Sequence, residues 1–591
     1  MGFDFLDFGF PRSGTDWKSI NGKPEITVSS KGRSNGLSNK INNGADFGVD
    51  TTLGATSPSQ TGPPYTQTLG MYESMNYLQS LGGGTLYFKR SGTINLSTMQ
   101  YFSATNTASM AQGTYNNIDI IFEKGTTFNL SQLVNSTLTP AVWNFFTFLQ
   151  GSSNITIHGN GTIIDYGSVS LPSGADGIYV FDFTQPLPNL SQFSNIEIEG
   201  FQIQNIAITK GGGAGGSILL GNGYNIKFHD NILLNIVGDV ADIGGSFVYV
   251  YNNILKGWGA NPALTVGTTY SSINVTDIWV YDNYFQTVYG NYTGGGNDEG
   301  ISIITQQAFS SNPLEVDRVY IFHNTFRGSN KYSGDIDNNQ WLGTLKGLLI
   351  ADNIFDYSDG YTSPWAISLD VTNVYDAYIL NNVIRTGGYS PTTSYIDLSS
   401  FYGTGTPASG TVNATIDGLY IYDTSTLPVT TAVLSLNGHV SETYSPSTTS
   451  IIRLKNIYGV NTKYLILNYG ATETPISIVE KIYGTISTGV VDVTATPITY
   501  MKDIPSNIIS TTTPAVPASA TAQQNTNPYA VNVYLYGGTV TAIQITKNGT
   551  AYTVFSNTTG LALSGQGYEL SPSDSIIITY TTVPTWVWMR D

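Results

Sequence analysis

The sequence predicts an all-β protein whose largest part is a parallel β-helix, a solenoid of stacked β coils. Three observations lead to this prediction. Only 11% of the 591 residues are charged, whereas an average soluble domain has about 25%. Glycine occurs 64 times and tyrosine 39 times, and 40% of the residues are hydrophobic, which is too many for a disordered chain. Finally, one short segment recurs along the middle of the chain, as expected for a repeat protein.

The recurring segment has an apolar residue at every second position, then a polar residue, an asparagine and a further apolar residue. Its six clearest copies occupy residues 226–234, 248–256, 278–286, 319–328, 348–356 and 377–385. The aligned asparagines are Asn231, Asn253, Asn283, Asn324, Asn353 and Asn382. Two earlier segments, 155–164 and 196–205, fit the same pattern with Asn160 and Phe201 at the aligned position.

Each copy is too short to bury its own apolar side, but stacked copies share one core. Alternation with a period of two sends every second side chain inward. Spacings of 22 to 41 residues between the aligned asparagines leave room for insertions that loop out at the corners. We therefore expect the six asparagines to turn the corner of each coil and to stack as a ladder of side-chain amides.

Three of the four histidines fall on or beside this corner: His158, His229 and His323. At the position of His323, the other copies carry Asn252, Asp282, Asp352 and Asn381. A position that accepts His, Asn and Asp in turn indicates a short polar corner residue. Because the three histidines are expected far apart along the solenoid axis, we expect no metal cluster.

The segments "ADFGVD" (45–50), "LGMYESMNYLQSLGGGTLYFKRSGTINLS" (69–97) and "NITIHGNGTI" (154–163) resemble the start of the pectate-lyase-like right-handed parallel β-helix superfamily. The "DGVTDDT" stretch that follows "ADFG" in that family is absent. The resemblance implies a right-handed parallel β-helix over about residues 44–400, with a helix at roughly 68–81 that caps its open end. Because the superfamily includes lyases, hydrolases, epimerases and phage tailspikes, the resemblance implies a fold and not an activity.

The rest of the chain divides into shorter parts. Residues 1–43 carry no repeat and are expected to form an irregular head that attaches to a particle. Residues 401–509 stay β-like without the corner asparagine, which indicates a distorted continuation of the solenoid or an added β module. Residues 510–528, rich in Pro, Ser, Thr and Ala, are typical of a linker. Residues 529–591 alternate strictly, with Gly537–Gly538 and Asn548–Gly549 at hairpin positions, which predicts a small β-sandwich-like domain.

This last part, with "NPYAVNVYLYGGTV" and "PTWVW", resembles the C-terminal modules of structural proteins from viruses that infect hot, acid-dwelling archaea. Spindle-shaped viruses are the nearest of these. The resemblance implies a virion structural protein such as a tail fibre or tailspike.

The net charge of −17 argues against nucleic acid and anionic membranes as partners, because both need clustered Lys and Arg. No apolar run approaches the ~18 residues needed to span a bilayer. Asp4 and Asp7 stand where a signal peptide would be basic. The absence of cysteine excludes disulfides and thiolate metal sites. We therefore expect neither a membrane span nor a secretory signal peptide.

Asn-x-Ser/Thr sequons are dense, and two explanations stay open. An Asn-, Ser- and Thr-rich β protein makes such triplets by chance, or the surface is exposed and glycosylated. A glycosylated protein without a secretory signal fits a virus particle assembled inside its host. The possible N-glycosylation sites are Asn95, Asn129, Asn135, Asn154, Asn160, Asn189, Asn274, Asn291, Asn413, Asn548 and Asn557.

A β-helix enzyme that hydrolyses polysaccharide needs two carboxylates about 5–9.5 Å apart, and a lyase needs acidic residues that hold Ca²⁺ and a base. The candidate catalytic residues lie in or beside the insertions: Asp298, Glu299, Asp335, Asp337, Asp239 and Asp242. Their other role is as solvated turn formers, so the sequence names no firm catalytic residue. We expect no cofactor and no bound metal, with Ca²⁺ needed only if the protein is a lyase.

These observations favour a virion tail fibre or spike, a homotrimeric adhesin displayed on the surface of a virus particle. Loops such as "TVYGNYTGGGNDEG" and "GSNKYSGDIDNNQW" would offer aromatic faces and amides to host surface glycans or glycoproteins. One end of the rod would contact other virion proteins. The alternatives are a polysaccharide lyase or glycoside hydrolase, including a glycan-cleaving tailspike, and a component of an S-layer or surface filament.

Overall fold

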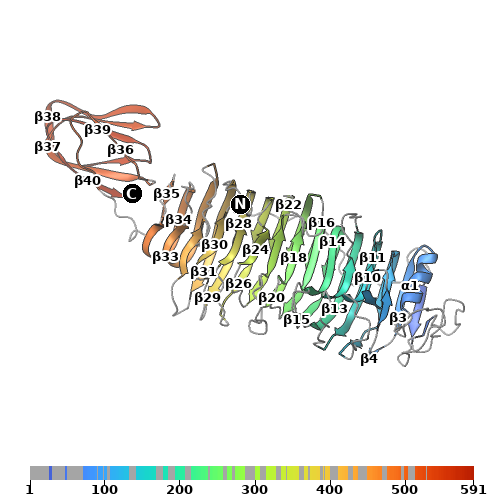
Figure 1. The fold of residues 1–591 in the computed structure, drawn as a ribbon. Helices are drawn as coiled ribbons and strands as arrows, with labels where there is room; N and C mark the ends of the chain where they lie inside the picture. The colour runs from blue at the N-terminus through green and yellow to red at the C-terminus, as the bar shows by residue number, and fades with distance from the viewer. Residues whose placement is uncertain are drawn as a thin grey trace.

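The structure, a computed structural model, describes most of the chain from residue 71 onward and two short strands before it. The described residues are 25–29, 47–48, 71–89, 91–96, 99–102, 105, 107–131, 142–167, 177–183, 193–206, 214–236, 240–256, 262–268, 273–286, 300–305, 314–327, 334–340, 343–358, 365–370, 373–386, 391, 393–399, 410–423, 430–436, 449–468, 476–493, 498, 500–503, 513–527 and 529–590. Figure 1 shows their strands stacked coil upon coil along a rod, with a smaller β module at the C-terminal end of the chain.

The strands of the rod lie on three faces. Face 1 holds β1 (Glu25–Ser29), β2 (Phe47–Gly48), β3 (Gly84–Lys89), β8 (Asn116–Phe122), β19 (Val275–Tyr281), β22 (Glu315–Phe322), β25 (Thr344–Ala351) and β28 (Asn373–Leu380). Face 2 holds β4 (Gly92–Asn95), β9 (Thr126–Asn129), β15 (Ile232–Ile236), β17 (Ile254–Lys256), β20 (Tyr284–Gln286), β23 (Thr325–Arg327), β26 (Ile354–Asp356) and β29 (Val383–Thr386). Face 3 holds β6 (Thr107–Ser109), β7 (Ala111–Gly113), β10 (Val142–Phe148), β12 (Gly177–Phe183), β18 (Leu264–Gly267), β21 (Ile301–Ile304), β24 (Gly334–Gln340), β27 (Trp365–Asp370), β30 (Ser394–Ser399) and β32 (Thr430–Ser435).

Longer strands turn a corner and belong to more than one face. These are β11 (Ser153–Asp165), β13 (Phe193–Ile206), β14 (Ala214–His229), β16 (Ala241–Tyr251), β31 (Val412–Asp423), β33 (Ile451–Asn468) and β34 (Ile476–Val493). Two short strands remain: β5 (Gln100–Phe102), which pairs antiparallel with β6, and β35 (Met501–Lys502), which pairs with β34.

Each strand pairs in parallel with its equivalents in the coils before and after it. In one coil, β22 pairs with β19 and β25, β23 with β20 and β26, and β24 with β21 and β27. The predicted all-β parallel solenoid is therefore confirmed. The core is made of columns of like side chains, one of which runs through buried Ile196, Ile226, Val248, Ile278, Val319 and Leu348.

The helix α1 (Met71–Ser80) lies at the N-terminal end of the rod (Figure 1). Its Met71, Met75 and Leu78 are fully buried, so they cover apolar side chains that the first coil would otherwise expose to water. The capping helix predicted at roughly 68–81 is therefore confirmed. No helix in the described part of the chain is long and apolar enough to cross a membrane.

The segment 1–43, which we expected to be an irregular head, contributes β1 to the solenoid. This strand pairs in parallel with β3 at five positions, from Glu25 opposite Thr85 to Ser29 opposite Lys89. The strand "EITVS" alternates polar and apolar residues, a pattern too short to stand out in a polar segment. The rest of residues 1–43 lies outside the described residues.

The six aligned asparagines form a ladder of buried side-chain amides. In each rung, one carbonyl oxygen accepts from both the backbone N–H and the side-chain amide of the asparagine before it. Asn324 Oδ1 accepts from Asn283 N at 3.0 Å and from Asn283 Nδ2 at 3.1 Å. The Asn324 amide donates in turn to Val280 O at 2.9 Å and to Asn353 Oδ1 at 3.1 Å. The ladder runs from Asn231 to Asn382, and each of its asparagines is at most 2% exposed.

The residue before each ladder asparagine has a left-handed backbone. Its φ is 54–55° at Asp230, Asn252, Asp282, His323, Asp352 and Asn381. Asn and Asp adopt this conformation more readily than other side chains, because their short polar groups bond locally. His323 therefore occupies a corner that selects a short polar residue, as its repeat alignment indicates.

Within 401–509, the residues that the structure describes continue the coil. The strand β31 pairs with β28 and β29, and β33 pairs with β31, β32 and β34, all in parallel. The corner asparagine is absent there. Buried Ala414, Ile452 and Ile476 still form a core column in these coils.

The C-terminal module is one antiparallel sheet of five strands: β36 (Ala522–Gln524), β37 (Val531–Lys547), β38 (Thr550–Leu570), β39 (Ser575–Thr582) and β40 (Thr585–Arg590). The long strands β37 and β38 curve so that the sheet folds over itself (Figure 1). Asn548–Gly549 forms the predicted hairpin turn. Gly537–Gly538 does not: it lies inside β37, where the partner strand changes from β40 to β39.

The linker predicted at 510–528 is wrong for residues 513–527, which belong to this module. The strand β36 pairs with β39. Pro514 O accepts a hydrogen bond from Trp586 Nε1 at 2.7 Å, and Thr513 Oγ1 accepts one from Trp588 N at 3.1 Å. Composition misled here because proline removes only a backbone donor, while its carbonyl remains a full acceptor.

We expect Asn324→Ala to destabilise the rod strongly. Val280 O and Asn283 N–H both lose their side-chain partner, and a buried backbone group without a partner costs about 1–3 kcal/mol. Guanidinium unfolding followed by circular dichroism measures the loss. Thr325→Ala, at the next and partly exposed position, is the matched control. Equal stability of the two variants would contradict the structural role of the ladder.

We expect a fragment of residues 513–591 to unfold cooperatively, and a fragment of residues 529–591 not to do so. The shorter fragment lacks β36 and the acceptor for the Trp586 indole. Near-ultraviolet circular dichroism reports the fixed packing of Trp586 and Trp588, which are both 3% exposed. If the shorter fragment shows the same signal and melting transition, residues 513–528 act as a linker after all.

Candidate functional site

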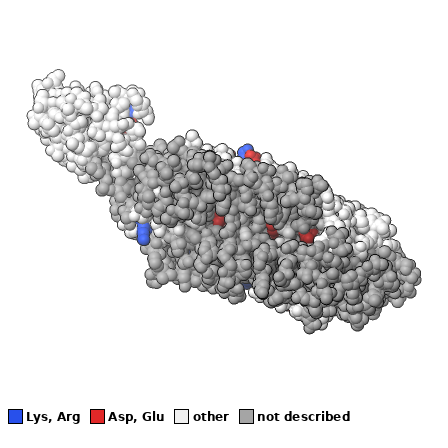
Figure 2. Space-filling model, in the orientation of Figure 1, with Lys and Arg blue, Asp and Glu red and all other residues white. Residues whose placement is uncertain are grey.

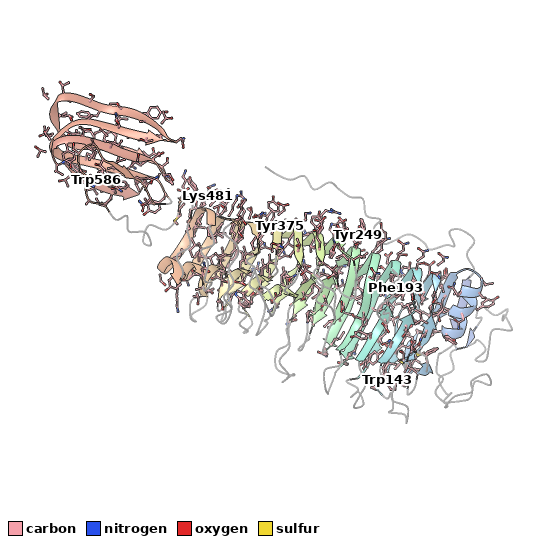
Figure 3. All side chains as sticks on the ribbon, turned by 45° about the horizontal axis from the view of Figure 1, so that its top comes forward. Trp143, Phe193, Tyr249, Tyr375, Lys481 and Trp586 are labelled. Carbon is pink, nitrogen blue, oxygen red and sulfur yellow. The ribbon has the colours of Figure 1, made fainter. Side chains whose placement is uncertain are left out.

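Outward-pointing side chains of face 1 form two parallel rows along the rod, because residues two apart in a strand share one side. Row A passes through Glu197, Lys227, Tyr249, Trp279 and Tyr320. Row B passes through His158, Glu199, His229, Tyr251, Tyr281 and Phe322. We call the aromatic part of both rows the aromatic strip: Tyr249, Trp279, Tyr320, Tyr251, Tyr281 and Phe322. Figure 3 shows Tyr249 on one side of the rod, with Tyr375 and Lys481 further along the same side.

The rings of the aromatic strip stack on one another from coil to coil. In row A, the centroids of Tyr249 and Trp279 are 4.6 Å apart with planes 1° from parallel, and those of Trp279 and Tyr320 are 5.5 Å apart. In row B, Tyr281 lies 5.0 Å from Tyr251 and 5.1 Å from Phe322. Every ring is partly exposed. The strip is thus a ribbed, half-exposed aromatic surface whose spacing the strand register sets.

The tyrosine hydroxyls of row B keep their protons over the physiological pH range. Partial burial, followed by the neighbouring Tyr281 and the carboxylates of Glu197 and Asp230, raises the pKa of Tyr251 above its ordinary value. Burial and the nearby Asp282 raise the pKa of Tyr281 to about 12. A protonated tyrosine both donates and accepts hydrogen bonds, so these rings combine an apolar body with a polar tip.

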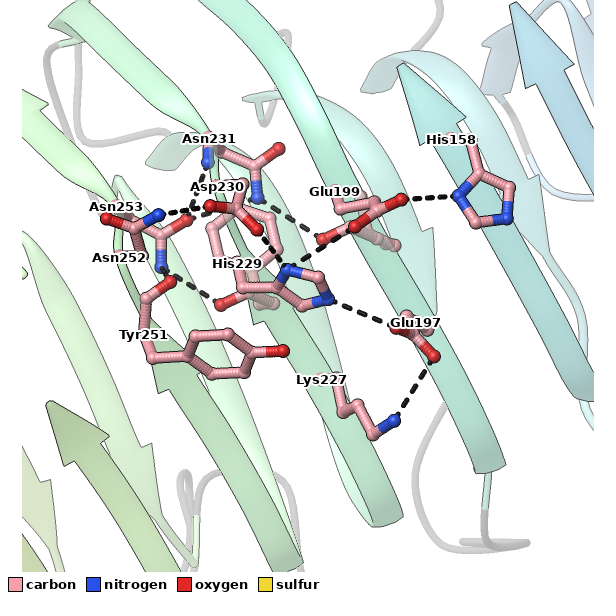
Figure 4. Close-up of polar contacts among 12 residues, drawn as sticks. His158, Glu197, Glu199, Lys227, His229, Asp230, Asn231, Tyr251, Asn252 and Asn253 are labelled. Carbon is pink, nitrogen blue, oxygen red and sulfur yellow. Dashed lines mark hydrogen bonds and ion pairs between the residues drawn. The ribbon is translucent and has the colours of Figure 1, made fainter. Parts of the chain in front are cut away.

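The strip begins at a cluster of charged side chains on β11, β13 and β14 (Figure 4). We call it the carboxylate–imidazole cluster: His158, Glu197, Glu199, Lys227, His229 and Asp230. His229 lies at its centre, with a side chain only 6% exposed. Its ring stacks on Tyr251 with centroids 4.4 Å apart and planes 7° from parallel, so the cluster and the strip are continuous.

His229 faces three carboxylates. Its Nε2 lies 3.1 Å from Glu197 Oε1, and its Nδ1 lies 2.7 Å from Asp230 Oδ2 and 3.5 Å from Glu199 Oε2. The outer oxygens of the glutamates have further partners: His158 Nδ1 lies 2.5 Å from Glu199 Oε1, and Lys227 Nζ lies 3.3 Å from Glu197 Oε2.

These contacts shift two pKa values in opposite directions. The hydrogen bond from His229 and the charge of Lys227 outweigh burial and lower the pKa of Glu197 to about 2. Burial alone would lower the pKa of His229, but hydrogen bonds to Glu197 and Asp230 and the charge of Glu199 raise it above its ordinary value. The carboxylates around His229 thus favour its protonated form, the imidazolium.

The edges of the strip carry paired charges. Arg318 donates to both oxygens of Asp277, at 2.8 and 2.6 Å, and to Asp317 at 2.6 Å. On the other edge, the exposed His323 lies 3.7 Å from Asp282. Figure 2 shows only isolated charged side chains on the described surface in that view, which agrees with the low charge content of the chain.

Those candidate catalytic residues that the structure describes do not meet on an open surface. Asp239, Asp298 and Glu299 lie outside the described residues. Asp242 and Asp337 lie on face 3, where both are buried and are separated by the intervening Thr265 and Ser302 of successive coils. The expected meeting of acids across adjacent coils is thus not seen among the described residues.

Asp335 is an interior residue. Its Oδ2 accepts a hydrogen bond from Tyr357 Oη at 2.6 Å, and both side chains are buried. Gly300 occupies the equivalent place in the preceding coil, where a Cβ atom would lie 2.8 Å from the core ring of Phe326, so this position faces inward. Burial raises the pKa of Asp335 to about 7. A buried carboxyl with one tyrosine partner fits a structural role.

The expectation that the histidines lie far apart is wrong for two of them. His158 and His229 both contact Glu199, although 71 residues separate them in the sequence. His323 alone stands apart. The aromatic strip was also missed, although its signal is present in three of the aligned copies: those at 248–256, 278–286 and 319–328 each carry aromatic residues at two alternate outward positions, as in Trp279 and Tyr281.

Several sequon asparagines use their side chains in bonds between coils. Asn129 Nδ2 donates to Asn95 Oδ1 at 2.8 Å, and Asn154 Nδ2 donates to Asn117 Oδ1 at 2.8 Å. Asn160 Nδ2 donates to Phe122 O at 2.9 Å. Backbone N–H groups bond to the side-chain oxygens of Asn274 and Asn413. Glycosylation of these sites stays a prediction, and Asn135, Asn189 and Asn291 lie outside the described residues.

No family model and no curated protein sequence matches this chain. Among solved structures, it is similar to mutants of the tailspike protein of E. coli bacteriophage HK620. One of these gives 12% identity and a TM-score of 0.42, covering 90% of this chain and 89% of that chain. A complex with a hexasaccharide gives 13% identity and a TM-score of 0.42, and one with a pentasaccharide 13% and 0.37, both covering 90% of each chain. The structural neighbours are thus phage tailspike proteins, but likeness at this level assigns no function to this chain.

We expect the stability that His229 contributes to be greatest between about pH 4.5 and 6.5. The lowered pKa of Glu197 adds stability above its ordinary value of 4.5, which is lost as the pH falls toward about 2. The raised pKa of His229 adds stability below 6.5, which is lost as the pH rises through the folded value. Within this window, His229→Gln should lower the free energy of unfolding by about 1.5–3 kcal/mol, typical of a charged hydrogen bond.

Guanidinium unfolding in EDTA from pH 3 to pH 9 measures this profile. The control is His323→Gln, which changes an exposed histidine on the same corner and should lower the free energy of unfolding less than His229→Gln does. A difference between wild type and His229→Gln that stays flat across the range would contradict the assigned ion pairs.

Proposed function

We propose that this protein is a rod-shaped adhesin that binds host cell-surface glycans along the aromatic strip. The observation that carries the proposal is the strip itself, two rows of half-exposed rings spaced 4.6–5.5 Å apart. Sugar rings present apolar C–H faces that pack on aromatic side chains, and tyrosine hydroxyls and carboxylates bond to sugar hydroxyls. In the strip the ring faces stack on one another, so the ring edges and the tyrosine hydroxyls are the parts that would contact a sugar.

The geometry favours a linear glycan lying along the rod. The spacing of the rings is close to the length of one sugar unit in an extended polysaccharide, so successive sugars would meet successive coils. The rings are held by stacking and by paired strands before any ligand arrives. A surface that is already ordered loses little side-chain freedom on binding. The carboxylate–imidazole cluster would accept hydrogen bonds from hydroxyls at one end of the glycan.

The rod suits display on a particle. A solenoid exposes no sheet edge along its length, so it resists lateral aggregation. We propose a virion tail fibre or spike, assembled as a homotrimer and attached to other virion proteins through one end. This placement rests on the sequence resemblance of residues 529–591 to modules of archaeal virus proteins. Fractionation of virus particles followed by electron microscopy tests it.

We expect the double change Trp279→Ala and Tyr281→Ala to weaken glycan binding by at least tenfold. The change removes one ring from each row at the centre of the strip, and central aromatic residues usually dominate a binding surface. A glycan array prepared from host surface polysaccharide first identifies a ligand. Calorimetry with that oligosaccharide then compares wild type with the variant.

Tyr552→Ala is the matched control, because Tyr552 is 53% exposed and lies in the C-terminal module, away from the strip. It should bind as wild type does. Unchanged affinity of the double variant, with a native circular dichroism spectrum, would refute binding along the strip. Chromatography of the same incubations for released oligosaccharides separates an adhesin from a glycan-cleaving enzyme.

A further inference from the structure

We propose that Glu197, Glu199 and His229 bind one divalent transition-metal ion, Zn²⁺ or Mn²⁺. Each of these side chains offers one ligand atom, and the three atoms lie within 4.8 Å of one another. The ligands belong to the carboxylate–imidazole cluster, which lies beside the aromatic strip, and metal binding is tested without glycan.

The three ligands stand on two paired strands. Glu197 and Glu199 are two residues apart on the same side of β13, and His229 lies opposite Glu199 on β14. Ligands mounted on strands are positioned more accurately than ligands on loops. Metal–ligand bonds of about 2.0–2.2 Å require ligand atoms roughly 3–3.5 Å apart. His229 Nε2 lies 3.1 Å from Glu197 Oε1, within that range, and the Glu199 carboxylate must turn toward the same side of the imidazole to complete the site.

Each proposed ligand also has the outer partner that a metal site needs. Asp230 Oδ2 holds His229 Nδ1 at 2.7 Å, which leaves Nε2, the atom beside Glu197, to face the ion. His158 holds the outer oxygen of Glu199, and Lys227 holds that of Glu197. Partners of this kind orient metal ligands and keep the correct imidazole nitrogen free.

A protonated His229 cannot form a good hydrogen bond to every carboxylate around it, whereas a metal ion can bind several carboxylates at once. His229 supplies at most two N–H donors, yet it faces three carboxylates. Nδ1 bonds to Asp230 at 2.7 Å, so Glu199 Oε2, at 3.5 Å from the same nitrogen, is left at the limit of a hydrogen bond. A divalent ion held by Glu197, Glu199 and His229 would give both glutamates one shared positive partner.

The donor set selects the ion. Ca²⁺ and Mg²⁺ prefer ligand shells made only of oxygen, whereas one imidazole with two carboxylates suits Zn²⁺ and Mn²⁺. Glu197 and Glu199 are 31% and 26% exposed, so an ion reaches them from solvent. Three protein ligands leave further coordination positions open to water.

Calorimetric titration tests the site. The full chain is stripped with EDTA, dialysed and titrated at pH 7.5 with ZnCl₂, and separately with MnCl₂. We expect one ion per chain to bind with at least one of the two metals. The variants Glu197→Gln and Glu199→Gln keep the shape of the side chain and remove its charge, and each should weaken binding at least tenfold.

Asp282→Asn is the control, because Asp282 is an exposed carboxylate beside His323 on the same face, and it should bind metal as wild type does. Circular dichroism confirms that all variants are folded. Absence of saturable binding by wild type would overturn the proposal, as would equal binding by wild type and both glutamine variants. Neither outcome bears on the glycan assay, which is run in EDTA.

Discussion

The rod depends on hydrogen bonding in register between one coil and the next, and from Asn231 to Asn382 the buried asparagine corner enforces that register. Each Asn Oδ1 accepts from both the backbone and the side chain of the preceding asparagine. A slip of one residue would bury a polar corner without partners and turn the core-facing side chains toward solvent. Such a slip costs far more than any single contact contributes, so insertions of very different length leave the stacking of the coils unchanged.

Because the register is fixed, outward-pointing side chains of successive coils line up in rows that run along the rod. Outward positions two residues apart in each strand become row A and row B, and like residues then stack on like. The same constraint brings His158, Glu199 and His229 together, although 41 and 30 residues separate them in sequence. Charges placed so close must be compensated locally, which is why the pKa of Glu197 is low and that of His229 is high.

The sequence reveals those parts of the molecule that are encoded locally and repeatedly. The solenoid, its capping helix and the left-handed corner residue follow from period-two alternation and from one recurring asparagine. The pairing of individual outward residues does not, because it depends on where each insertion ends. Distance along the sequence therefore led to the wrong prediction that His158 and His229 lie far apart. Composition likewise hid the role of residues 513–527, since the bond from Trp586 to Pro514 O leaves no mark in the residue types.

The proposed binding surface lies on paired strands and not on the loops between them. The sequence directs attention to the aromatic and amide-rich insertions, because loops commonly carry function. The outward rows of face 1 carry the same chemistry on paired strands, where stacking already restricts each ring. A ligand that binds there loses little free energy in ordering the protein, and its successive sugars would meet rings at similar spacing, 4.6–5.5 Å, in the coils of the strip. A rigid rod with a built-in row of rings is therefore better suited to a repetitive polymer than a set of unequal loops, each presenting a different surface.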